Sequence, residues 1–252
     1  METSSKTPAA TPHFSMVIPA YNEADYLPRL LDTVDAARER YYRGAEAVEV
    51  IVADNASTDA TAEIARQRGC QVVRVEKRVI AAVRNGGARA ARGEILAFID
   101  ADSQIHPETF NAIEAVMNTG EAVGGASGVR AERLSPGIAA IYAIVVPVFW
   151  ITGMDTGVVF CRRADFEALG GYDENKLFSE DSTFLFALRK LGRSRGQKLK
   201  RVTAVKAVTS TRKWDKHGDW HYIPVMLKGL YALFFNTRSL ERFARKYWYE
   251  DR

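Results

Sequence analysis

Short apolar runs alternate with amphipathic segments along the first half of the chain. Each run has five or six residues, too few for a buried helix and typical of a strand covered on both faces. The runs lie at 14–19, 48–53, 71–75 and 95–99. Between them, apolar residues recur at helical spacing, as Leu27, Leu30 and Val34 do. This β-α-β-α-β-α-β order with short links predicts an α/β fold: a mostly parallel, Rossmann-like sheet with helices on both faces.

Capping residues suggest where the helices begin. We expect the first helix to start at Asn22, with Asp25 completing a partial capping box and Pro28 in the first turn. Ser57 or Asp59 is expected to cap the second helix. The helices are predicted at 22–43, 60–68, 81–92 and 107–117, with Arg84 near the start of the third.

The regular alternation of short strands and helices ends at Gly120, and longer, less regular elements follow. The expected elements are a strand at 122–131, a helix at 138–150, a strand at 157–162, a helix and turn at 166–174, a helix at 180–191, a strand at 202–208 and two C-terminal helices. We therefore divide the chain into a disordered tail (1–12), a nucleotide-type half-sheet (13–120), a less regular half of the same domain that could build an acceptor side (121–215) and amphipathic C-terminal helices (216–252).

Polar residues follow three of the predicted strands, at 19–23, 54–59 and 100–102. The carboxyl ends of parallel strands share one edge of a sheet, where open α/β folds bind their ligands. Asp100 and Asp102 stand one residue apart at this edge, and two desolvated carboxylates favour a bound divalent cation. The alternative is an ordinary polar turn and helix cap before Pro107.

The composition bears on three classes of function: nucleic-acid binding, metal binding by cysteines and membrane spanning. The net charge of +4 over 252 residues does not indicate a nucleic-acid partner. Cys70 and Cys161 lack metal-type spacing and fit thiols in a reducing compartment. No apolar run reaches 18 residues, so a simple spanning helix is not expected, although 137–152 and 222–235 suit either a membrane interface or packing on the protein body.

Neither Gly-x-Gly-x-x-Gly after the first strand nor a P-loop is present, which disfavours a dinucleotide enzyme and a P-loop NTPase. Other motifs occur, in this order: Val17-Ile18-Pro19-Ala20-Tyr21-Asn22-Glu23, Asp54-Asn55-Ala56-Ser57-Thr58-Asp59, Arg84-Asn85-Gly86, Asp100-Ala101-Asp102, Gly170-Gly171-Tyr172-Asp173-Glu174 and Glu180-Asp181. Their order and spacing resemble those of the family 2 glycosyltransferases, which have the A-type nucleotide-sugar fold. The resemblance covers about 14–192.

The resemblance implies roles for single residues. Asp54 would bind the base and Arg84 would lie near the base or the phosphates. Asp102 would be the principal ligand of Mn²⁺ or Mg²⁺, and Asp181 the general base that deprotonates an acceptor hydroxyl. The remaining assignments are Pro19, Ala20, Tyr21, Glu23 and Ala101 to the nucleotide site, Asp100 to the ribose and the metal, and Glu180 and Trp150 to the acceptor side. Asn55 stands where a second carboxylate is often found in the family.

The segment 209–214 looks like a mobile Ser-x-Arg-Arg-type segment of some family members. There Arg212 and Lys213 would clamp a diphosphate, and His217 would complete the metal shell or simply be solvated. An apolar helix at 138–150 and basic, aromatic C-terminal helices suggest a lipid-linked acceptor, with the protein cytoplasmic or peripheral on the inner membrane face.

The leading hypothesis is a metal-dependent inverting transferase that moves a sugar from a UDP- or GDP-sugar to an acceptor hydroxyl. A sugar-1-phosphate nucleotidylyltransferase is the first alternative, although it would need a Gly-rich loop after the first strand, and 19–23 contains no glycine. A non-catalytic nucleotide-sugar-binding module is the second alternative, and the intact carboxylates argue against it.

Overall fold

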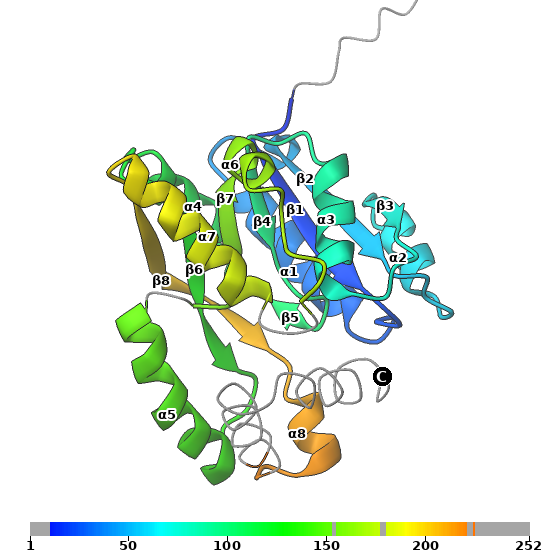
Figure 1. Cartoon of the computed structure of the whole chain (residues 1–252). Coiled ribbons are helices and arrows are strands. Elements are labelled where there is room, and N and C mark those ends of the chain that lie inside the picture. Colours follow the sequence, from blue (N-terminus) through cyan, green and yellow to red (C-terminus); the bar gives the residue numbers. More distant parts are fainter. Residues whose placement is uncertain (1–10, 153–154, 177–179, 221–223, 225–252) are drawn as a thin grey trace, which may run out of the picture.

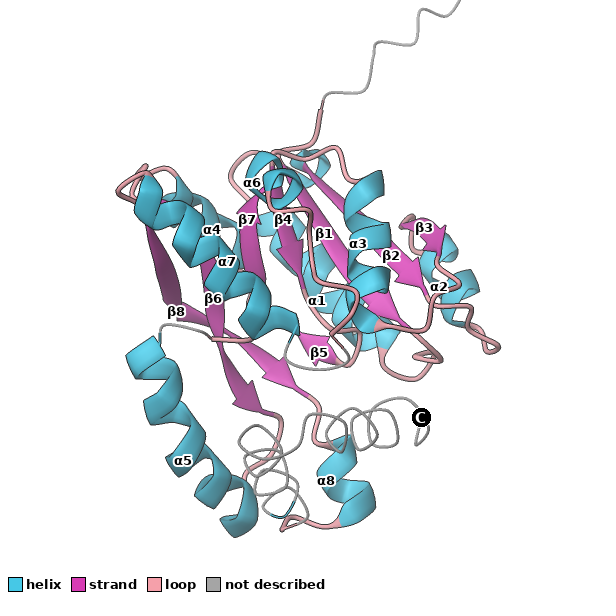
Figure 2. Cartoon of the chain, viewed as in Figure 1, coloured by secondary structure: helices cyan, strands magenta, loops and turns pink. Residues whose placement is uncertain are grey.

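One mixed sheet forms the centre of the molecule (Figures 1 and 2). The structure is a computed structural model that describes residues 11–152, 155–176, 180–220 and 224. In these residues the strand order is β3-β2-β1-β4-β7-β6-β8-β5, and β1 to β4 are parallel to one another. β7 runs antiparallel to β4 and β6, and β6 is parallel to β8. The strands are β1 (Phe14–Ala20), β2 (Val48–Asp54), β3 (Gln71–Arg74), β4 (Ile95–Phe98), β5 (Ser103–Gln104), β6 (Ala122–Ala131), β7 (Val159–Arg162) and β8 (Lys198–Thr209).

Helices cover both faces of the sheet, which confirms the predicted α/β architecture. α1, α2 and α4 contribute to one buried apolar cluster, and α3, α6 and α7 contribute to the other. α5 and α8 lie beyond these layers, at one end of the molecule (Figure 1). The helices are α1 (Leu27–Arg40), the short 3-10 helix η1 (Ala45–Ala47), α2 (Thr61–Gln67), α3 (Ile80–Ala90), α4 (Thr109–Met117), α5 (Pro136–Thr152), α6 (Arg163–Ala168), α7 (Glu180–Ser194) and α8 (Arg212–His217).

β1 is buried on both faces because its side chains alternate between the two clusters. Met16 and Ile18 belong to the cluster under α1, and Val17 belongs to the cluster under α3. α3 lies unusually close to the sheet at Gly87, where a Cβ would stand 2.5 Å from Cγ1 of Val17. Gly86 has the same relation to Val75, at 2.4 Å. These two glycines therefore fix how closely α3, and the arginine that it carries, approaches the strands.

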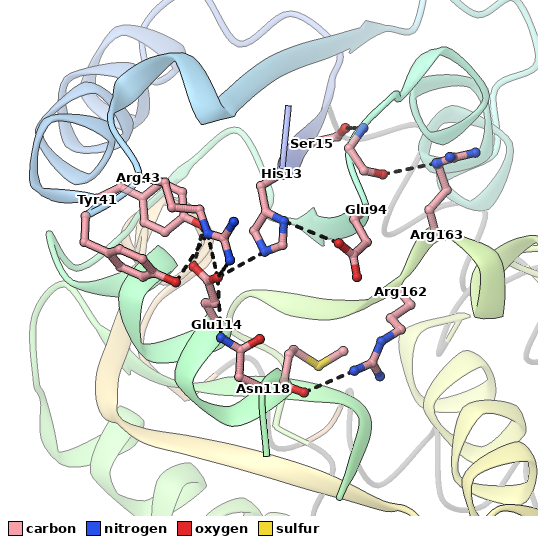
Figure 3. Close-up of polar contacts among 12 residues, drawn as sticks. His13, Ser15, Tyr41, Arg43, Glu94, Glu114, Asn118, Arg162 and Arg163 are labelled. Atoms are coloured by element: carbon pink, nitrogen blue, oxygen red, sulfur yellow. Dashed lines mark hydrogen bonds and ion pairs between the residues drawn. The ribbon is translucent and has the colours of Figure 1, made fainter. Parts of the chain in front are cut away.

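A buried carboxylate connects several segments at the amino edge of the sheet, where β1 begins (Figure 3). Glu114 of α4 is 1% exposed; it accepts hydrogen bonds from the Tyr41 hydroxyl and from Arg43 Nε at 2.7 Å, and His13 Nε2 lies 3.3 Å away. Burial by itself raises the pKa of the Glu114 carboxyl, but hydrogen bonds from Tyr41, Tyr42 and Arg43 and the charge of His13 outweigh it and lower the pKa to about 2. The network joins α4 to the end of α1 and the start of β1.

The first helix differs from its prediction. α1 begins at Leu27 and not at Asn22, although Pro28 does lie in its first turn as expected. Asn22 has a φ of 51°, outside the helical range, and its side chain binds the neighbouring loop instead. The capping box with Asp25 is therefore wrong. At the second helix, Asp59 Oδ1 accepts from the backbone N–H of Thr61, the first residue of α2, at 2.9 Å.

Other differences concern short elements. Arg84 lies in the middle of α3 and not at its start, because that helix begins at Ile80. β5 and α8 were not predicted, and β8 begins at Lys198, four residues earlier than expected. The predicted helix at 138–150 is present as α5. Most of the expected disordered tail and the two C-terminal helices lie outside the described residues. Within the described part, no helix has the length and apolar character needed to cross a bilayer.

Candidate active site

The loops that follow β1 and β2 lie against each other at one edge of the sheet. Pro19 and Ala20 end β1, and Ala20 is paired in register with Asp54, the last residue of β2. Both loops therefore leave the sheet at the same carboxyl edge. The Asn22 side-chain oxygen accepts from the backbone N–H of Thr58 at 2.9 Å, which holds one loop against the other. The convergence predicted for these two motifs is confirmed.

Tyr21 and Asp54 were expected to receive the nucleotide base. The Arg78 guanidinium lies 5.3 Å from the centre of the Tyr21 ring, within the range of a cation–π contact. Asp54 is only 3% exposed, and its Oδ1 accepts from the backbone N–H of Ser57 at 3.3 Å. The ring and the carboxylate thus belong to the interlocked loops, and each is oriented by a neighbour.

Arg84 joins two sequence motifs through one guanidinium group. Its Nη1 donates to Glu180 at 2.7 Å and to Asp181 at 2.6 Å, and its Nη2 donates to Asp100 at 2.8 Å. The side chain is 5% exposed, and the guanidinium lies 5.4 Å from the centre of the buried Tyr172 ring. The three carboxylates would repel one another in a site of low polarity, and Arg84 supplies the positive charge that allows them to lie together.

The Asp181 carboxyl is poised to exchange a proton near neutral pH. Burial raises its pKa, the Arg84 guanidinium opposes that effect, and the nearby charges of Glu180 and Asp100 add to it, so that the pKa stands at about 6. A pKa close to the working pH is the value that general acid–base chemistry favours.

Asn85 fixes the turn that supports the Arg84 cluster. Its amide nitrogen donates to the Tyr172 carbonyl at 2.9 Å and to Glu174 at 3.0 Å, while its amide oxygen accepts from the Tyr172 backbone N–H at 2.9 Å. Gly171 has a φ of 76°, and a Cβ there would lie 2.6 Å from the Asn85 amide oxygen. The glycine is therefore required on both counts, and the Tyr172 ring is held beneath the arginine.

Asp100 and Asp102 follow β4, as the sequence predicts. The Asp100 side chain is 56% exposed, the Asp102 side chain is 20% exposed, and Ala101 between them is buried. Their oxygens are the hard donors that Mn²⁺ and Mg²⁺ accept. Within the described residues, no cluster of three or more His, Cys, Asp or Glu is arranged to hold a metal ion. A cation held by these two carboxylates would take its other ligands from outside the pair.

Arg212 bridges the first and third loops. Its Nη1 and Nη2 each donate to one oxygen of Glu23 at 2.6 Å, and its Nε lies 3.2 Å from Asp102. The same guanidinium lies 4.8 Å from the centre of the Tyr26 ring. This bidentate geometry is the strong form of an arginine–carboxylate pair. The predicted phosphate clamp is thus positioned at the carboxylates of the site.

A two-residue strand explains how Arg212 reaches the site. Ser103 of β5 pairs with Thr209, the last residue of β8, and the Ser210 backbone N–H donates to the Asp102 carbonyl at 3.2 Å. The segment before α8 is therefore fastened directly behind the carboxylate pair. Sequence patterns miss a strand of this length because two residues carry no periodicity.

The remaining predicted residues lie on α5 and α8. Lys213 is half-buried in the first turn of α8, and His217 is the exposed last residue of that helix. The assignment of His217 to a metal shell stays a prediction. Trp150 lies near the end of α5, and its side chain is outside the described set.

Comparison with solved structures identifies the fold. The chain superimposes on glucosyl-3-phosphoglycerate synthase from Mycobacterium tuberculosis, solved with Mn²⁺ and uridine diphosphate, with a TM-score of 0.58 and 22% identity, covering 87% of this chain and 80% of that one. It also superimposes on the mannosyltransferase PcManGT from Pyrobaculum calidifontis, solved with GDP-Man and Mn²⁺, with a TM-score of 0.58 and 24% identity, covering 80% and 57% of the two chains. The fold is the A-type nucleotide-sugar fold of glycosyltransferases.

Sequence similarity to one family covers part of the chain. Residues 15–135 match the family described as "Glycosyl transferase family 2". The glycosyltransferase AglE from Haloferax volcanii is 34% identical over 125 residues, which are 45% of this chain and 39% of that protein. The match therefore spans about two fifths of this relative's length. Residues 15–135 of the chain therefore form a domain that is similar to glycosyl transferase family 2.

Three residues of the site had no role in the sequence-based assignment. Asn85 and Tyr172 were noted within motifs, but their mutual contacts were not foreseen, and Tyr26 beneath Arg212 carried no signal. The Gly-Gly pairs at 86–87 and 170–171 were the available indication that neighbouring side chains pack directly on the backbone, as they do at Gly86, Gly87 and Gly171.

Proposed function

We propose that this chain is a metal-dependent inverting glycosyltransferase. It moves a sugar from a UDP- or GDP-sugar to the hydroxyl of a lipid-linked acceptor. The observation that carries the proposal is the Arg84 cluster, because one buried guanidinium joins a carboxylate of pKa about 6, Asp181, to the strand-end carboxylate Asp100. That arrangement connects the proposed base, which would face the acceptor oxygen, to the carboxylate on the donor side of the site.

The nucleotide side of the site is assigned to the interlocked loops. Tyr21 would contact the base, and Asp54 would accept a hydrogen bond from a base N–H. Glu23 holds Arg212 over the same loops, so Arg212, followed by Lys213, is positioned to bind the diphosphate oxygens. We assign residues 13–120 to donor binding and residues 121–215 to the acceptor and catalytic half.

Asp100 and Asp102 would hold Mn²⁺ or Mg²⁺ together with oxygens of the diphosphate. Such a cation, when bound, neutralises charge that develops on the leaving phosphates. The fit rests on the donor set: the two carboxylates follow a buried strand, and one of them is half-exposed. Because Arg212 Nε already faces Asp102, the clamp and the metal ligand would act on the same group of oxygens.

Asp181 would take the proton of the acceptor hydroxyl as that oxygen attacks the anomeric carbon. A single displacement of this kind inverts the anomeric centre, and the proton ends on the carboxylate. Arg84 holds Asp181 in place and Glu180 lies beside it, on the acceptor side together with α5. We place the reaction at the cytoplasmic face of a membrane, with the protein peripheral to it.

Calorimetric titration with UDP and GDP, with and without Mn²⁺, tests the donor site. We expect Mn²⁺ to tighten binding of one nucleotide, and Asp102→Asn to abolish that effect. A panel of UDP-Glc, UDP-Gal, UDP-GlcNAc and GDP-Man, scored by metal-dependent donor hydrolysis, then identifies the sugar. Binding that never responds to metal, for any nucleoside diphosphate, would refute the proposal, and pyrophosphate release from a nucleoside triphosphate would favour the nucleotidylyltransferase.

A further inference from the structure

α5 is apolar on every side and does not have a single apolar stripe. Its 17 residues, Pro136–Thr152, include no charged side chain. Ile138 and Ile141 near its start are buried, whereas Ile144 is 55% exposed and Val146 is 37% exposed. A helix that is hydrophobic all round normally lies inside a protein or in lipid. Beyond its first turns, the described part of the chain covers α5 incompletely.

Exposed apolar side chains gather at this helix. Six large hydrophobic residues are exposed in the described part of the chain, and four of them, Leu134, Ile144, Val146 and Trp220, lie on α5 or at its base. Trp220 belongs to the base because its neighbour Asp219 packs on the start of α5, where a Cβ at Gly137 would lie 2.7 Å from the Asp219 carbonyl oxygen. We call these four residues the apolar arm. A concentration of this kind marks an interaction surface.

Basic residues surround the base of the apolar arm. Arg130 on β6, Lys206 on β8 and Lys216 on α8 are all exposed. The acidic residues of the same region are paired with arginines: Asp215 and Asp219 are bound by Arg133, at 2.6 and 2.8 Å, and Glu132 is bound by Arg29. The surface beside the apolar arm therefore carries an excess of positive charge, which is complementary to an anionic surface.

The apolar arm is connected to the candidate active site through α8. Arg212, the first residue of α8, binds Glu23 in the site, and Asp215 of the same helix binds Arg133 just before α5. Figure 1 shows α5 and α8 at one end of the molecule, and β5 at the edge of the main body that faces them. A surface that docks on the apolar arm would thus lie on the side of the molecule from which α8 reaches the candidate active site.

We propose that the apolar arm docks on a lipid bilayer that contains anionic headgroups, with α5 lying in the interface. A second copy of the chain would be expected to cover one stripe of α5, whereas lipid tails contact an apolar helix without regard to its side, and the basic residues match anionic headgroups. That docking presents a lipid-linked acceptor to the site rests on the proposed function. The membrane contact itself does not.

Vesicle flotation of the full chain tests the docking. Vesicles of phosphatidylcholine alone are compared with vesicles that also contain phosphatidylglycerol. We expect binding to the anionic vesicles, weakened by added salt. The double variant Ile144→Ser/Val146→Ser should lower partitioning roughly tenfold or more, and Arg130→Gln/Lys216→Gln should lower it by about tenfold.

Matched controls separate docking from general effects. Phe186→Ser removes an exposed hydrophobic side chain from α7, and Arg66→Gln/Arg89→Gln removes two exposed charges from α2 and α3. Neither control should change partitioning. Binding that survives the Ile144/Val146 change would overturn the proposal. So would a wild-type dimer that does not bind vesicles and becomes monomeric in that variant by sedimentation velocity. Nucleotide titration on the same samples reports independently on the proposed function.

Discussion

Arg84 and Asp181 are 97 residues apart in sequence, yet Nη1 of the arginine donates to Oδ1 of the aspartate at 2.6 Å. The same guanidinium holds Asp100 through Nη2. The candidate base and the candidate metal side are therefore not independent groups. A change at Arg84 must therefore alter the positions of both carboxylates, the candidate base and the one beside the donor.

Arg84→Lys should lower the rate of transfer far more than it lowers donor affinity. A lysine ammonium keeps the positive charge, but it cannot reach three carboxylates with the geometry of a guanidinium. We expect kcat to fall about 10²-fold, within the range that acid–base positioning contributes, with the donor Kd changed only a few-fold. Steady-state kinetics and calorimetry measure the two quantities. Equal losses in both would show that Arg84 serves donor binding instead.

The pH dependence of kcat/KM should have an acidic limb near pH 6. Below the pKa of about 6, the Asp181 carboxyl is protonated and cannot accept the hydroxyl proton, so the rate falls as the pH falls. Glu180→Gln removes a neighbouring negative charge that raises this pKa, so the limb should move to lower pH. A limb that stays in place would argue that another group titrates. Glu167→Gln, an exposed glutamate on α6, serves as the control.

Asp181→Asn should abolish transfer while nucleotide binding remains. The asparagine amide is nearly isosteric with the carboxylate but cannot take up a proton at neutral pH. Metal-enhanced UDP or GDP binding should stay within a few-fold of the wild type in calorimetry. Transfer at the wild-type rate would refute the assignment of the base, and loss of nucleotide binding would show that the residue supports the donor site.

Local patterns predicted most of the fold because strands and helices in this chain bury continuous or periodic apolar faces. β1 alternates between two cores, so Val17 and Ile18 are apolar for separate reasons and the run is recognisable. Asn22 was misassigned because a side chain that suits a helix cap also suits a left-handed loop residue. Hydrogen bonds from the loop at 57–59 decide which of the two conformations Asn22 adopts. The residues next to Asn22 in the sequence carry no information about that loop.

Site residues could be named from the sequence, but their partners could not. The strand-end positions of Asp54 and Asp100 follow from the parallel sheet. The contacts of Arg84 with carboxylates 16 to 97 residues away depend instead on how closely α3 packs on β1 and on where α7 begins. The bond between Arg212 and Glu23 spans 189 residues and depends on a two-residue strand.

Arg212→Lys should weaken diphosphate binding selectively. The lysine cannot reproduce the bidentate bond to Glu23, so the cation would no longer be held over the loops. A charged hydrogen bond contributes about 1.5–3 kcal/mol, so UDP or GDP affinity should fall roughly ten- to hundredfold. Affinity for the parent nucleoside should be unchanged, because the clamp acts on phosphate only. Equal losses for nucleoside and diphosphate would place Arg212 in the structure of the base-binding loops instead.

Glu114→Gln should destabilise the fold without touching the site, because Glu114 lies at the opposite, amino edge of the sheet. A carboxyl whose pKa falls from 4.5 to about 2 on folding contributes about 3 kcal/mol to the free energy of unfolding at neutral pH. That contribution is complete above the unfolded pKa and disappears as the pH falls from about 4.5 through about 2. Urea titrations should therefore separate wild type from variant at pH 7 and bring them together near pH 2. Glu63→Gln, at an exposed glutamate, provides the control. If the difference in the free energy of unfolding between Glu114→Gln and wild type stayed the same in acid, packing and not the ionised carboxylate would stabilise this edge.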